Sequence, residues 1–216
     1  GVRLVGSEMC IRDSYVITDV ERKRKFVCVD PHDMPIIAVV DPDMMSSMPK
    51  GLTAATGMDA LTHAIEGYIT KGACTISDMF HLEAIRLISE NLRGAVQNTE
   101  AGREGMALGQ YIAGMGFSNV GLGIVHSMAH KTGAAFADYG AHIIHGAANA
   151  MYLPKVIAFN AKDETAKKRY GVIADYMHLG GNNDDEKVQL LIKYLRNMND
   201  ELNIPHCICL LYTSPS

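Results

Sequence analysis

From Pro49 almost to the end of the chain, apolar residues recur with the spacing of one face of an α-helix. No repeat or low-complexity tract interrupts this pattern, and a Gly180–Asn183 loop separates its last two segments. Asp163 and Asp184-Asp185 are typical of helix N-termini. The pattern predicts a helical domain over residues 49–208, with helices over 52–68, 79–96, 106–117, 124–136, 147–159, 165–177 and 187–202.

Residues 15–48 follow a different pattern, in which short β-branched and aromatic runs are bounded by charged or Pro-containing turns. Such runs are typical of strands, which we expect over Tyr15–Val20, Lys25–Val29 and Pro35–Val40. We interpret residues 15–48 as the C-terminal remnant of an α/β nucleotide-binding domain. The fold class is therefore mainly α, with an all-helical domain preceded by this remnant.

The charge and composition exclude several classes of protein. Twenty Lys and Arg stand against 24 Asp and Glu, so there is no basic excess for a nucleic-acid partner. No apolar run reaches 18 residues, and no signal peptide is visible at the start. The five cysteines form no CxxC pair. We expect a soluble, cytoplasmic protein with no nucleic-acid or membrane partner.

Both ends of the chain look foreign to the rest. Residues 1–14 and 209–216 match no periodic template. One DNA segment that encodes GSEMCIRD also encodes CLLYTSPS when its reverse complement is read, and it resembles a sequencing-library adapter. We expect that residues 1–14 and 209–216 are translated adapter flanking a genuine fragment, and we exclude them from the fold prediction.

Three pairs of titratable residues lie on the predicted helices or beside them. Asp59 and His63 are four residues apart, as are His126 and His130, while His142 and His145 precede a Gly/Ala-rich segment. Residues at i and i+4 share one face of a helix. Burying such groups is costly unless they are paired or bind a metal. A single pair is more often incidental, so the spacing alone leaves a metal site and ordinary packing about equally supported.

Three long segments carry a resemblance to a known family: GLTAATGMDALTHAIEGYIT, GMGFSNVGLGIVHSMAHKTGA and HGAANAMYLP. They resemble the signature segments of the iron-dependent (group III) alcohol dehydrogenases, and the resemblance runs from Tyr15 to Pro205. The segment from Tyr15 to Ala73 is especially similar to the branch that interconverts lactaldehyde and 1,2-propanediol. The resemblance implies a dehydroquinate synthase-like architecture and an NAD(P)-dependent oxidoreductase acting on a small alcohol or aldehyde.

The resemblance also implies roles for particular residues. Asp59, His63, His126 and His145 correspond to the ligands of Fe²⁺, and their donor set would also suit Zn²⁺. His130 corresponds to a position near substrate and nicotinamide, where it could relay the hydroxyl proton. Lys25 corresponds to a position that approaches the coenzyme, NAD or NADP. A homodimer is implied for the full-length protein.

Two departures from the family pattern affect these assignments. Eighteen residues separate His126 from His145, more than is usual in the family, which leaves His142 as a rival ligand. The segment HGAANA favours His145. No glycine-rich pyrophosphate loop follows a strand in this chain, so we expect the isolated fragment to be inactive even with an intact metal site.

Two other interpretations stay open. The first is a butanol- or ethanol-type enzyme of the same family. The second is a non-catalytic helical module in which the same ligands hold helices together around a metal. His32 and His81 lie outside the ligand pattern, and we expect them at the surface or at helix caps.

Overall fold

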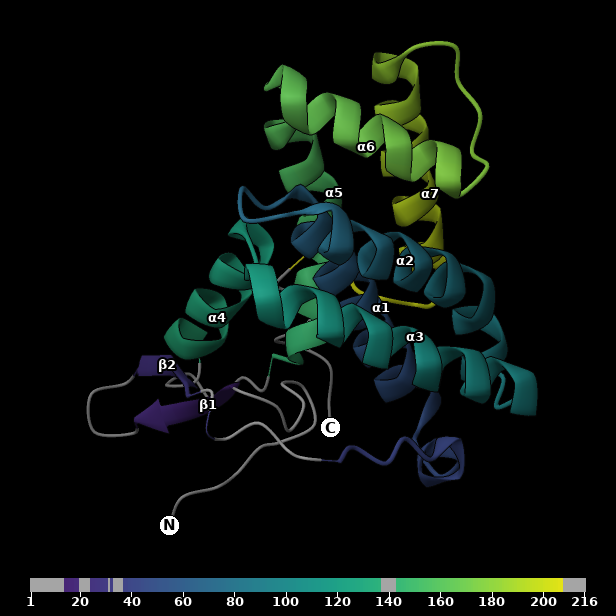
Figure 1. The fold of residues 1–216 in the computed structure, drawn as a ribbon. Coiled ribbons are helices and arrows are strands. Elements are labelled where there is room, and N and C mark those ends of the chain that lie inside the picture. The colour runs from purple at the N-terminus through teal and green to yellow at the C-terminus, as the bar shows by residue number, and fades with distance from the viewer. Residues whose placement is uncertain (1–13, 20–23, 31, 33–36, 137–142, 208–216) are drawn as a thin grey trace.

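The computed structural model describes residues 14–19, 24–30, 32, 37–136 and 143–207. Figure 1 shows a helical body with a two-stranded hairpin at one end. The helices are α1 (Lys50–Ile69), α2 (Thr75–Val96), α3 (Glu100–Val120), α4 (Ile124–Phe136), α5 (His145–Asn160), α6 (Glu164–Tyr176) and α7 (Asp184–Glu201). All seven predicted helices are confirmed, and most begin two or more residues earlier than predicted.

Helix α1 forms the centre of the body and packs against α2, α3 and α5. Its residues 54, 55 and 57–68 are all buried, so it has no solvent-facing stripe. A helix that is enclosed on every side must be apolar all round or must pair its polar groups internally. The polar residues of α1 at 59, 62, 63 and 66 therefore need partners inside the protein.

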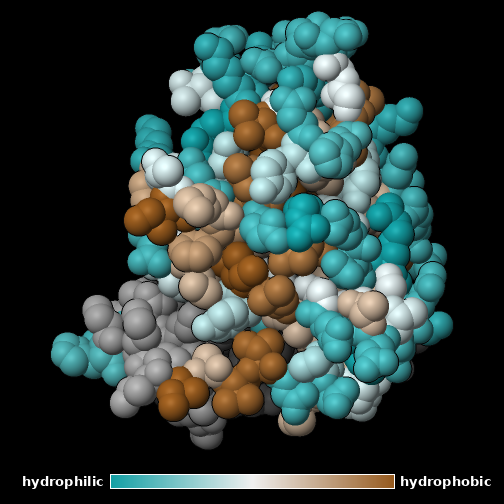
Figure 2. All heavy atoms as spheres, turned by 45° about the vertical axis from the view of Figure 1, so that its right-hand side comes forward, coloured by the Kyte–Doolittle hydropathy of each residue, from teal (hydrophilic) through white to brown (hydrophobic). Residues whose placement is uncertain are grey.

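The outer helices bury one face each, and some apolar side chains remain exposed. Ile76, Met79 and Phe159 are each more than 60% exposed. Figure 2 shows apolar residues gathered along the middle of one face, with hydrophilic residues around them. No helix within the described ranges is both long and apolar enough to cross a bilayer.

The N-terminal part contains an antiparallel hairpin of β1 (Ser14–Asp19) and β2 (Arg24–Val29). These strands confirm two of the three predictions. The third predicted strand is wrong over its described part, because residues 37–40 are exposed and have no strand conformation. A β-branched run forms a strand only when a neighbouring strand completes its backbone hydrogen bonds, and the described sheet has β1 and β2 alone. Ser14, the last residue of the N-terminal segment predicted to be foreign, begins β1 and pairs with Val29. Residues 1–13 and 209–216 lie outside the described part, so the foreign origin of residues 1–14 and 209–216 stays a prediction.

Two glycines determine how α4 and α5 approach α1. Gly121 ends α3 with a φ of 79°, a left-handed conformation that suits glycine, and α4 begins three residues later. At Gly146, a Cβ atom would lie 2.1 Å from the carbonyl oxygen of Ala55 in α1. The first turn of α5 therefore touches the backbone of α1, which is possible only without a side chain.

The prediction that His81 lies at the surface or at a helix cap is wrong. Its side chain is fully buried in α2, between Gly67 of α1 and Gly116 of α3. Neither ring nitrogen has a hydrogen-bond partner in the described part of the chain. The two glycines make room for the ring, a tertiary arrangement that the sequence around His81 does not reveal. His32, by contrast, is exposed as predicted.

Candidate metal centre

Three helices that are separate in sequence bring a carboxylate and two imidazoles to one point. Asp59 lies in the middle of α1, His126 in the first turn of α4, and His145 at the first residue of α5. Asp59 and His126 are buried, and the His145 side chain is 9% exposed. One potential ligand atom from each residue lies within 4.8 Å of the other two.

The distances within this cluster are those expected around a metal ion. Nε2 of His126 lies 3.4 Å from Oδ1 of Asp59, and Nε2 of His145 lies 3.8 Å from the same oxygen. Ligand bonds of ~2.1 Å in a tetrahedral site would separate neighbouring ligand atoms by ~3.4 Å. Only small side-chain movements are therefore needed for the three residues to coordinate a common ion.

The charged groups of the cluster shift the pKa values of Asp59 and His126. Burial alone raises the pKa of Asp59, but His63, His126 and His145 together lower it below its usual range. Burial alone lowers the pKa of His126, but Asp59 and Glu66 raise it to about 9. Asp59 is thus stabilised as an anion by the imidazoles beside it.

His63, the fourth predicted ligand, lies beside the cluster. Its ring stacks on His126 at a centroid distance of 4.4 Å and on Phe117 at 4.5 Å. It does not belong to the group whose ligand atoms lie within 4.8 Å of one another. The structure therefore brings three of the four predicted ligands together and places the fourth against the ring of His126.

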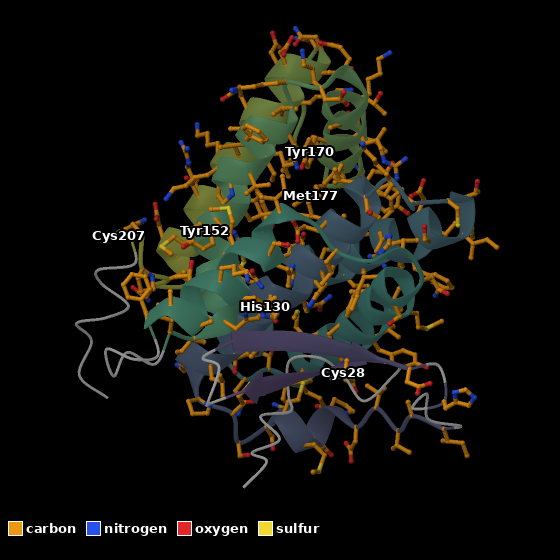
Figure 3. The ribbon with its side chains drawn as sticks, turned by 90° about the vertical axis from the view of Figure 1, so that its left-hand side faces the viewer. Cys28, His130, Tyr152, Tyr170, Met177 and Cys207 are labelled. Atoms are coloured by element: carbon orange, nitrogen blue, oxygen red, sulfur yellow. The ribbon has the colours of Figure 1, made fainter. Side chains whose placement is uncertain are left out.

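His130 lies one turn after His126 on α4, and its ring stacks on His145 at a centroid distance of 4.6 Å. It is half-buried, and Figure 3 shows it on the side of the helical body that faces the hairpin. Helix α4 also contacts β2, the strand that contains Lys25. The side chain of Lys25 and the whole of His142 lie outside the described residues, so those two assignments stay predictions.

Sequence reasoning missed two residues of the site. Asn149, fully buried on α5, donates from Nδ2 to Oδ1 of Asp59 at 2.5 Å and lies 3.1 Å from Nε2 of His145. Glu66, buried on α1, contacts Nδ1 of His126 at 2.7 Å. Helical spacing could have found both, because Asn149 follows His145 by four residues and Glu66 follows Asp59 by seven.

A surface pocket of about 970 Å³ is lined in part by Glu66. Its lining includes Leu153, Phe159 and Arg169, but none of the three clustered residues. The chemistry available to Asp59, His126 and His145 is therefore not located in that pocket.

The chain matches a family model. The model describes the C-terminal part of the Fe-containing alcohol dehydrogenase family, and it matches residues 53–209. Lactaldehyde reductase of Escherichia coli strain K12 is 51% identical over 194 residues, which cover 89% of this chain and 49% of that protein. An NADPH-dependent butanol dehydrogenase of Clostridium saccharobutylicum is 46% identical over 190 residues, covering 88% of this chain and 47% of that protein.

The fold matches solved structures of the same kind. The crystal structure of a 1,3-propanediol oxidoreductase aligns with a TM-score of 0.85 at 37% identity, covering 94% of this chain and 52% of that one. The chain thus spans about half the length of the proteins it matches. These findings confirm the resemblance and the fold class inferred from the sequence.

Proposed function

Because the chain belongs to the iron-containing alcohol dehydrogenase family, we propose that it is the metal-binding part of an NAD(P)-dependent alcohol dehydrogenase or aldehyde reductase. The observation that carries the proposal is the convergence of Asp59, His126 and His145 from three helices onto one point. We assign Asp59, His63, His126 and His145 as ligands of Fe²⁺, with Zn²⁺ as an alternative ion.

The residues present fit such an ion. A carboxylate and imidazoles without a thiolate suit Fe²⁺ or Zn²⁺. Nε2 of His126 is buried and makes no hydrogen bond within the described residues, although Asp59 lies 3.4 Å away. A buried imidazole nitrogen that faces a carboxylate in this way is a suitable metal ligand. When bound, the divalent ion would supply Lewis acidity toward the oxygen of the substrate.

We assign His130 as the residue that moves the substrate proton. Oxidation of an alcohol transfers a hydride from carbon to the nicotinamide and releases the hydroxyl proton. His130 is stacked on His145 and is half-buried, so it can connect the centre of the site with its surroundings. An imidazole can accept and release a proton near neutral pH.

The names of two relatives suggest the coenzyme and the substrate. The butanol dehydrogenase is named as NADPH-dependent, and the reductase is named for lactaldehyde, so we propose NAD or NADP and a small alcohol or aldehyde such as 1,2-propanediol or lactaldehyde. Residues 15–48 would then belong to the nucleotide-binding domain, with Lys25 near the coenzyme, and residues 49–208 to the helical metal-binding domain. The full-length protein is proposed to be a homodimer.

The test replaces the matching 194-residue region of E. coli lactaldehyde reductase with the matching residues of this chain, leaving out residues 209–216. The proposal predicts Fe²⁺-dependent reduction of lactaldehyde with NADH or NADPH, and loss of activity in Asp59→Ala. His32→Ala, which removes an exposed imidazole, is the matched control and should remain active. A higher rate with butanal would favour the butanol-type alternative. Tight metal binding without any reductase activity would contradict the enzymatic role and favour the helical metal-binding module.

A further inference from the structure

Glu66 is the most heavily hydrogen-bonded carboxylate in the described interior, and the reaction outlined above gives it no role. It is 6% exposed, on the face of α1 that also carries Asp59. Its Oε1 accepts from the backbone N–H of Val125 at 2.7 Å. Its Oε2 accepts from the N–H groups of Gly123 and His126, both at 3.2 Å.

These three N–H groups belong to the beginning of α4. The first N–H groups of a helix have no partner within the helix, and their dipoles favour a negative charge nearby. Glu66 therefore caps α4 from the neighbouring helix and fixes the position of the turn that carries His126.

The fourth contact of Glu66 is to the His126 ring, whose Nδ1 lies 2.7 Å from Oε2. Three backbone N–H donors already face the two oxygens of Glu66, so its carboxylate acts as an acceptor here, and we infer that Nδ1 carries the proton. The lone pair of the neutral ring is then on Nε2, the atom that lies 3.4 Å from Asp59. One side chain thus determines the backbone position, the ring orientation and the protonated nitrogen of His126.

We propose that Glu66 is a positioning residue for the metal centre, which holds His126 with a proton on Nδ1 and with Nε2 directed at the ion. This inference rests on the proposed metal site. Carboxylate–histidine–metal arrangements orient the ligand in this way, and loss of the outer partner lowers metal affinity 10–100-fold.

Gly123 supports the same positioning role for Glu66. A Cβ atom there would lie 2.7 Å from Oε1 of Glu66, so a side chain at this position would push the carboxylate away. The absence of a side chain at Gly123 lets Glu66 approach the start of α4.

The experiment compares the unaltered chain with Glu66→Gln and Glu66→Asp. Gln keeps the shape of Glu but replaces one acceptor oxygen by an NH₂ group, which faces either the α4 N–H groups or Nδ1–H. Asp keeps the charge but is one methylene shorter. Thr99→Ala is the matched control, because it removes the side-chain cap of α3 without touching His126.

The first readout is ¹⁵N NMR of the His126 ring in the metal-free chain, recorded above the ring's pKa of about 9 so that the ring is neutral and carries one proton. The proposal predicts a protonated Nδ1 with a slowly exchanging proton, and rapid exchange of that proton in Glu66→Gln. This readout does not require metal, so it tests Glu66 even if the unaltered chain binds no ion and the proposed function fails. An unprotonated Nδ1 in the unaltered chain would overturn the proposal, even if both variants failed to fold.

The second readout is the Kd for Co²⁺ together with the visible absorption of the Co²⁺ site. Glu66→Gln should weaken binding 10–100-fold and alter the spectrum, while Glu66→Asp should retain part of the affinity. Thr99→Ala should lower the melting temperature but leave both Kd and spectrum unchanged. A Glu66→Gln chain with the same Kd and spectrum as the unaltered chain would overturn the proposal.

Discussion

Substitution of Gly146 by alanine tests whether close contact between α1 and α5 is needed to assemble the metal centre. Gly146 directly follows His145, and an added Cβ atom would lie 2.1 Å from the carbonyl oxygen of Ala55 and 3.1 Å from Cβ of Asp59. The obstructing atom nearest to the new methyl group belongs to the backbone of a buried helix, which cannot rotate away. The start of α5 must therefore retreat from α1 by roughly 1 Å.

The cost of this displacement can be judged from the structure. Overpacking a well-filled interior costs about 1–3 kcal/mol, whereas replacing glycine by alanine inside a helix contributes about 0.5–1 kcal/mol in the opposite direction. We expect Gly146→Ala to lower the free energy of unfolding by about 1–2 kcal/mol. Because His145 moves with the first turn of α5, metal affinity should fall by at least ~10-fold.

The assay combines urea unfolding, followed by circular dichroism, with Zn²⁺ titration calorimetry. Gly51→Ala is the matched control, because nothing lies within 4 Å of a Cβ atom at that position in the first turn of α1. It should be neutral or slightly stabilising and should keep the Zn²⁺ affinity. If Gly146→Ala matched the control in both stability and Zn²⁺ affinity, close contact between α1 and α5 would not be needed to assemble the metal centre.

Three further predictions concern separate parts of the molecule. Burial lowers the pKa of His81 from 6.5 to about 4, so between pH 6.5 and pH 4 the unfolded chain binds more protons than the folded chain. The free energy of unfolding should therefore fall by up to roughly 3 kcal/mol as the pH decreases from 7 to 4. Urea unfolding of His81→Leu should show a smaller decrease, because the variant lacks this imidazole. Asn149→Ala removes the amide beside Asp59 and His145, and calorimetry should show ~10-fold weaker Zn²⁺ binding; an unchanged Kd would refute its role. Deleting residues 1–13 and 209–216 should leave the melting temperature unchanged, and a drop of several degrees would show that these ends belong to the fold.

The helices could be predicted because their apolar spacing persists over many turns and their ends carry recognisable residues. Asp163, predicted at a helix start, accepts a hydrogen bond from the first turn of α6. Asp184 and Asp185 lie in the first turn of α7, as predicted, although the loop residue Asn183 provides the cap. The strand expected over Pro35–Val40 is wrong over residues 37–40, the part that the structure describes, because strand formation depends on a partner elsewhere in the sheet. Propensity alone does not supply that partner.

Only part of the site could be predicted, because some of its residues depend on contacts between helices. Spacing and resemblance identified Asp59, His126 and His145, because a metal requires particular residue types on facing helices. Helical spacing places Glu66 and Asn149 on the faces of their helices that carry the predicted ligands. Their contacts across helices, with His126 and Asp59, depend on distances that no local pattern encodes. The buried position of His81 likewise depends on two glycines that lie on other helices.

Asp59, His126 and His145 are proposed to bind one divalent ion, with His63 as the fourth ligand. The most direct measurement is an anomalous difference map from crystals of the chain loaded with Zn²⁺, recorded at the zinc absorption edge. We expect one strong peak at ~2.0–2.2 Å from an Asp59 oxygen and from Nε2 of both His126 and His145. No peak at this position, or a peak coordinated by His142 in place of His145, would contradict it.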